Sequence, residues 1–214
     1  MKFVLSLKHW QLFLITFGIP FALYLVFFAT MFATMMSQVG APQSPAFPAT
    51  MIAGGIIIGI AWLIAIVSSV TWNFNVATGL FKKLPPGTTL KIKRYYFAFF
   101  FPMIYVITII LLCLLFFVTV DKSEMQSNQP PAFVFWIFLI IPLHFFAAAC
   151  VFYTMYFIAK CLKSVELQRE AQIGEYVGEF VLTWFFMIGV WFIQPRINQI
   201  FSNKGDTITS GSPG

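Results

Sequence analysis

The densest group of chemically capable side chains lies in residues 160–179, where four carboxylates and three bases follow one another. They are Lys160, Lys163, Glu166, Arg169, Glu170, Glu175 and Glu179. Carboxylate oxygens suit hard divalent cations, so a metal-dependent enzyme acting on lipid is one interpretation. Acids and bases three or four residues apart on a helix also form ordinary ion pairs. No His or Asp lies in this segment. We therefore expect no bound metal, no cofactor and no catalytic residue, and treat these glutamates and Arg169 as candidate polar sites.

Glu175 and Glu179 lie four residues apart and would share one helix face, which is unfavourable unless cations, protons or water compensate. A loop rich in bases and free of acids could supply the cations: Lys82, Lys83, Lys91, Lys93 and Arg94. We expect the acidic segment 160–179 to dock on this loop. Alternatively each is solvated separately, and the loop binds anionic lipid at about 1 kcal/mol per base.

His144 is the one ionisable side chain deep within an apolar stretch. A charge is costly there, so such a group is a functional candidate, although a neutral imidazole can also simply hydrogen-bond to a neighbouring helix. Asn73 and Asn75 near the end of another stretch would either bond to neighbouring helices or line a polar path.

Familiar catalytic and metal-binding motifs are missing. With only two histidines, the sequence has no HExxH, CxxC, P-loop or GxSxG pattern. The three cysteines (Cys113, Cys150 and Cys161) have no spacing typical of a disulfide framework and are expected to behave as small hydrophobic residues.

The composition indicates a protein whose solvent is lipid. Of 214 residues, 60% are hydrophobic and only 9% charged, against about 25% charged in a soluble domain. The sequence also contains four charge-free apolar stretches, each more than 25 residues long. As helices, stretches of this length cross a bilayer of ~30 Å. We predict an all-α bundle of four transmembrane helices within one domain, residues 1–201, with spans at 10–36, 51–81, 95–120 and 131–159.

Three segments lie outside the four predicted spans and need separate predictions. Residues 180–194 form a short apolar run, either a half-membrane element or a fifth helix. The three prolines of residues 37–50 suit a polyproline II turn, and the polar tail 202–214 is predicted to be disordered.

The distribution of bases predicts the orientation. Ten bases fall on one side of the four spans and only Lys122 on the other, and basic loops stay in the cytoplasm. We therefore expect a cell-membrane protein with its N-terminus, and also its C-terminus, in the cytoplasm. The lipid bilayer and its anionic lipids are then the partners of the basic loop, and nucleic acid is not.

Several short stretches resemble a recurring group of small bacterial four-span membrane proteins that have no assigned activity. The stretches are Lys83–Pro85, Lys160–Glu166, Arg169-Glu170, Gly178–Phe180, Trp184–Phe186 and Trp191–Asn198. Where that group has a proline before Ile-Gly, this chain has Met187. The resemblance implies membrane location and supplies no catalytic residue.

Taken together, the sequence favours a non-enzymatic scaffold or accessory subunit that binds a protein partner, or a second copy of itself, through its charged cytoplasmic face. A small transporter or channel with a polar path near His144, Asn73 and Asn75 is the alternative. The absence of acids and arginines inside the spans is unusual for ion-coupled transport.

Overall fold

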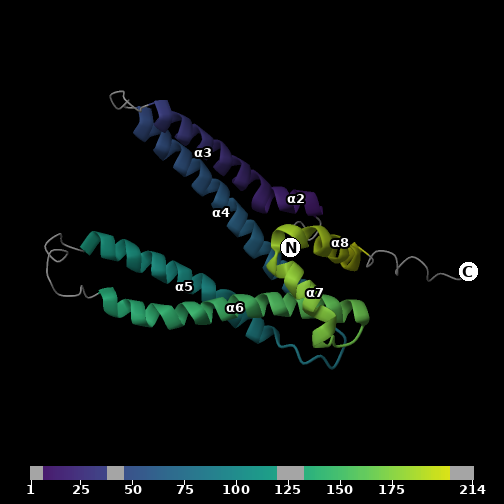
Figure 1. The fold of residues 1–214 in the computed structure, drawn as a ribbon. Helices are drawn as coiled ribbons and strands as arrows, with labels where there is room; N and C mark the ends of the chain where they lie inside the picture. Colours follow the sequence, from purple (N-terminus) through teal and green to yellow (C-terminus); the bar gives the residue numbers. More distant parts are fainter. Residues whose placement is uncertain (1–6, 38–45, 120–132, 203–214) are drawn as a thin grey trace, which may run out of the picture. The chain divides into compact units, whose positions relative to one another are not determined.

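The computed structural model describes residues 7–37, 46–119 and 133–202, and every regular element in these ranges is a helix (Figure 1). In chain order the elements are α2 (His9–Phe13), the π-helix η1 (Leu14–Gly18), α3 (Ile19–Ser37), α4 (Ala46–Phe81), α5 (Ile92–Thr119), α6 (Phe133–Leu167), α7 (Ile173–Trp184) and α8 (Phe186–Ser202). The predicted all-α class is confirmed.

Four helical stretches in the described residues are long and apolar enough to cross a membrane. They are His9–Ser37, Met51–Phe81, Ile92–Leu115 and Ile140–Leu167, in agreement with the four predicted spans. Large apolar side chains such as Leu63, Ile104 and Phe145 are at least 60% exposed along them. So much exposed hydrocarbon is stable in lipid and unfavourable in water, and the chain is an integral membrane protein.

Prolines account for one irregular turn and are accommodated in another, regular one. The π-helical turn Leu14–Gly18 ends two residues before Pro20. Pro20 has no N–H for the carbonyl of Thr16 and crowds it, so the helix widens there. Pro48 lies in the first turn of α4, where a missing N–H costs no hydrogen bond. The predicted polyproline II turn is therefore wrong at Pro48, and Pro42 and Pro45 lie outside the described residues.

The chain divides into two compact units. The first comprises Met1–Gly79 and Val181–Gly214. In it the short helix α2 packs on α8, where Trp191 contacts the rings of His9 and Phe13 at centroid distances of 4.8 and 5.6 Å. The ring of Phe27 in α3 lies against Gly54 of α4, so a glycine allows these two helices to approach closely.

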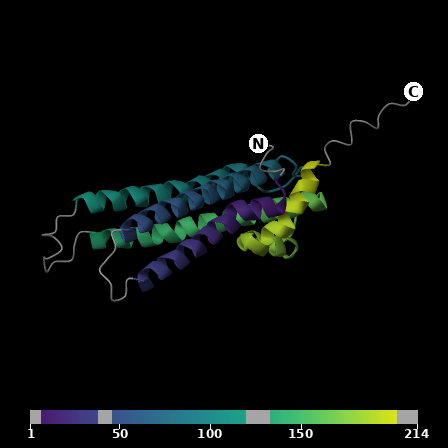
Figure 2. The same cartoon turned by 90° about the horizontal axis from the view of Figure 1, so that it is seen from above.

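The second unit comprises Leu80–Phe180. Its helices α5 and α6 run antiparallel, because Tyr95 contacts Phe157 whereas Phe101 contacts Phe146 farther along; Figures 1 and 2 show the pair. The fully buried side chains gather where α5 begins and α6 ends: Leu80, Tyr95, Phe157, Ile158 and Leu162. The packed core of this unit thus lies at its charged end.

Several boundaries differ from the sequence prediction. α6 continues past Ala159 to Leu167, so Lys160, Lys163 and Glu166 lie on the helix that contains the fourth span. The short apolar run 180–194 is divided between α7 and α8 by a turn at Phe185, and neither helix is among the four long enough to span. Ser202 ends α8; the rest of the predicted tail lies outside the described residues.

Candidate functional site

The candidate site is the charged end of the second unit, where a tight turn follows α6. Gln168 ends the helix with a φ of 54°, a left-handed conformation that reverses the chain after a helix. The buried Ser164 hydroxyl accepts a hydrogen bond from the backbone N–H of Ala171 at 3.0 Å. This turn folds the connector between α6 and α7, residues 168–172, back along α6 and brings Glu170 to Lys160.

Glu170 joins three elements. Its Oε1 lies 2.6 Å from Lys160 Nζ, and its carboxylate accepts hydrogen bonds from the backbone N–H of Thr89, at 3.1 Å, and from the Thr89 hydroxyl. The hydrogen bond from Lys160, and next the one from the Thr89 hydroxyl, lower the pKa of Glu170 to about 2. The carboxylate therefore tethers the loop before α5 to the connector.

Glu175 caps the start of α7. Its carboxylate accepts the backbone N–H of Gln172 at 2.8 Å, a bond that satisfies a free amide at a helix N-terminus. Both oxygens also accept hydrogen bonds from the Arg169 guanidinium, in the bidentate geometry that suits this pair of groups. The bonds from Arg169 and from Gln172 hold the pKa of Glu175 below its usual range.

Glu179 has a different cation. Its largely buried side chain lies 3.4 Å from Lys163 Nζ on α6, and the same amine is 3.7 Å from Glu166. The cations that compensate Glu175 and Glu179 are thus Arg169 and Lys163, from the connector and α6. The expectation that the basic loop supplies the cations is wrong for these two ion pairs, because the chain reversal after Gln168 brings Glu175 to Arg169 and Glu179 to Lys163.

The predicted basic loop does contact the connector, through Thr89. Lys82 and Lys91 are exposed and Lys83 is half-buried. Lys93 and Arg94 are not loop residues but belong to the first turn of α5, which begins at Ile92. Gly87 has a φ of 89°, which a glycine adopts without steric cost, and this allows the sharp turn after the two prolines.

The in-span polar candidates have local partners. His144 Nδ1 lies 3.4 Å from the Tyr105 hydroxyl across the α5–α6 contact, as expected for a hydrogen bond between helices. The Asn73 and Asn75 amides donate to the carbonyls of Ser69 and Thr71, four residues earlier on α4. His144 belongs to the second unit and both asparagines to the first.

A buried polar network in the first unit was not predicted. The Trp72 indole N–H donates to Gln194 Oε1 at 2.7 Å, and both side chains are fully buried. The Gln194 amide N–H group donates to the Leu7 carbonyl at 3.0 Å and to Asn198 Oδ1 at 3.0 Å. A sequence signal exists: Gln194 and Asn198 are amides four residues apart in an apolar segment and therefore share a helix face.

Within the described residues no three His, Cys, Asp or Glu side chains gather as a metal site would require. Cys150 and Cys161 are buried and Cys113 is exposed, all as free thiols. What the charged end can do chemically is hold a loop in a fixed place and present bases beside it.

No protein-family model matches the chain, and comparisons with curated proteins and with solved structures find no match. The resemblance to small bacterial four-span membrane proteins therefore stays a prediction.

Proposed function

We propose that this integral membrane protein is a non-enzymatic scaffold or accessory subunit. In this proposal the basic loop between α4 and α5, on the expected cytoplasmic side, binds an acidic segment of a protein partner. The residues that make the contact are the exposed bases Lys82 and Lys91, with Lys83, Lys93 and Arg94 around them.

The observation that supports the proposal is that three glutamates of the second half of the chain form ion pairs with bases outside the loop. Glu170, Glu175 and Glu179 pair with Lys160, Arg169 and Lys163, all outside the loop. The same Glu170 fixes the loop through Thr89. This basic surface has no acid in its own sequence and is already held in place. It therefore loses little further conformational entropy when it binds an acidic partner.

Charge complementarity of this kind acts mainly on specificity and on the rate of encounter. We therefore expect the complex to be sensitive to salt, because exposed charges are screened beyond about 10 Å at 0.1 M ionic strength.

The test is purification of the tagged full chain from native membranes in a mild detergent at low salt, with mass spectrometry and light scattering to give identity and stoichiometry. A stoichiometric partner is expected. It should be lost when Lys82 and Lys91 are both changed to Glu, and retained when Lys8, an exposed base of the first unit, is changed to Glu.

Two outcomes would count against the scaffold. A partner retained by the double variant would place binding elsewhere. A monodisperse homo-oligomer without partner that conducts ions in liposomes, with conduction lost on changing His144 to Phe, would support the transporter or channel instead.

A further inference from the structure

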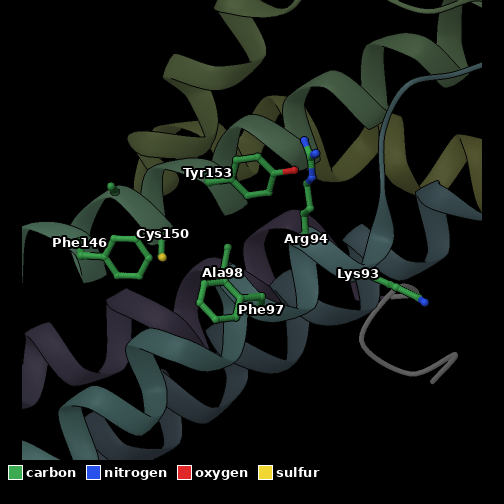
Figure 3. Close-up of a pocket in the computed structure, with 8 residues that line it drawn as sticks. Lys93, Arg94, Phe97, Ala98, Phe146, Cys150 and Tyr153 are labelled. Atoms are coloured by element: carbon green, nitrogen blue, oxygen red, sulfur yellow. The ribbon is translucent and has the colours of Figure 1, made fainter. Parts of the chain in front are cut away.

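A hollow of about 450 Å³ lies between α5 and α6 in the second unit. Figure 3 shows its two chemically different ends. At one end the Tyr153 phenol points toward the Arg94 guanidinium, and at the other the rings of Phe97 and Phe146 line the space. A neighbouring aromatic groove beside α7, which shares Tyr153, has no cation among its lining residues. Of these two hollows, the one between α5 and α6 therefore combines cations with an apolar wall.

The polar end carries positive charge without an acid. Lys93 and Arg94 line it and are exposed, and none of the other lining residues is a carboxylate. A guanidinium presents paired N–H groups that match the oxygens of a phosphate, and a phenol can donate one further hydrogen bond. The charge at this end is complementary to a phosphate monoanion.

The apolar end is open because small residues line its floor. Ala98 and Cys150 are buried and Ala149 is exposed. The much larger rings of Phe97 and Phe146 contact each other edge to face, with their centroids 6.3 Å apart, and form one wall. From Tyr153 back to Phe146, both lining residues on α6, the helix rises roughly 10 Å at 1.5 Å per residue. The hollow therefore extends about two turns from the charged helix start into the span.

We propose that this hollow binds one anionic phospholipid, with its phosphate on Arg94 and Tyr153 and the first part of an acyl chain along the paired rings of Phe97 and Phe146. Arg94 lies at the beginning of the third span, the level at which lipid headgroups meet protein. The lipid would be a structural ligand of the α5–α6 pair. This site adjoins the proposed protein contact and shares Lys93 and Arg94 with its surroundings, but the two can be tested separately because the lipid site does not use Lys82 or Lys91.

The test uses the purified full chain in detergent, titrated with dioleoyl-phosphatidylglycerol, dioleoyl-phosphatidylcholine or inorganic phosphate. Native mass spectrometry gives stoichiometry and affinity, and thermal unfolding gives stabilisation. We expect one phosphatidylglycerol per chain, binding at least about tenfold more tightly than phosphatidylcholine, and no stabilisation by inorganic phosphate.

Two variants address the two ends separately. Arg94→Gln should weaken phosphatidylglycerol binding about tenfold, and Ala149→Phe should weaken it similarly by filling the apolar end. Because Ala149 is exposed, its replacement should leave unfolding without lipid unchanged. Lys82→Gln, an exposed base outside the hollow, is the matched control and should bind like the unmodified chain.

The proposal is overturned if both phospholipids bind equally, if Lys82→Gln weakens binding as much as Arg94→Gln, or if Ala149→Phe binds normally. Stabilisation by inorganic phosphate equal to that by lipid would also overturn it, since it would indicate a simple anion site with no acyl-chain groove.

Discussion

Glu170 accepts hydrogen bonds from an amine, a hydroxyl and a backbone amide, and each donor favours the ionised carboxylate. A glutamate whose pKa is about 2 when folded and ordinary when unfolded stabilises the folded state above its unfolded pKa. That contribution is fully present at neutral pH and is lost as the pH falls from about 4.5 toward 2.

We therefore predict that Glu170→Gln lowers the melting temperature at pH 7 by a few degrees, the shift expected for a loss of about 1 kcal/mol in a chain of this size. Its melting temperature should also fall less than that of the unmodified chain between pH 5 and pH 3. Thermal unfolding in detergent measures both. Glu166→Gln is the control and should keep the acid sensitivity; equal acid sensitivity in Glu170→Gln would contradict the prediction.

The Trp72–Gln194 hydrogen bond is the second residue-scale feature with a measurable consequence. Changing Gln194 to Leu leaves the buried indole N–H and the Leu7 carbonyl without this partner, and we expect a loss of about 1–2 kcal/mol. A double-mutant cycle with Trp72→Phe, measured by denaturant unfolding in detergent, should give less than the sum of the two single losses. Strict additivity would mean that the bond contributes nothing.

At the scale of elements, the break between α7 and α8 depends on close backbone approach. A methyl group at Gly189 would lie 1.7 Å from the carbonyl oxygen of Leu182, so no side-chain rotation could relieve the clash. A methyl group added at Gly178 on α7 would meet no atom within 4 Å. The sharp turn at Phe185 is therefore built on a glycine whose role is steric.

We predict that Gly189→Ala destabilises the chain by about 1–3 kcal/mol, a typical cost of overpacking. Gly178→Ala is the matched control. It should be neutral or slightly stabilising, because alanine favours helix. Comparing the two melting temperatures in detergent measures the effect, and a neutral Gly189→Ala would show that α7 and α8 can separate at no cost.

At the scale of the whole molecule, four apolar helices require a membrane, and the position of the bases predicts which side each loop faces. A cysteine at Lys91 in a variant without the three native cysteines should react with an impermeant maleimide only after the membrane is opened. A cysteine at Ser210 should do the same if the C-terminus is cytoplasmic. Labelling of the Lys91 cysteine in intact cells would reverse the proposed orientation, and labelling of the Ser210 cysteine alone would indicate a fifth crossing.

The sequence by itself determined the solvent of this protein and the number of its long helices. Uninterrupted apolar length and the scarcity of charge are properties of composition, so they needed no tertiary information. The same reasoning found the charged segment, but it looked for the cations of Glu175 and Glu179 in the basic loop, because the chain reversal after Gln168 that brings Arg169 and Lys163 to these acids is not visible in local spacing.

Only the tertiary structure decided how the polar groups pair. The left-handed turn at Gln168 places Glu170 against Lys160 and Thr89, and the chain reversal after α7 contributes Gln194 and Asn198 to a network with Trp72 and Leu7. Partners such as Trp72 and Gln194 are 122 positions apart, so no local spacing rule could join them. The physical reason is that hydrophobicity and charge act through composition, whereas a hydrogen bond depends on angstrom-scale geometry that only the folded chain provides.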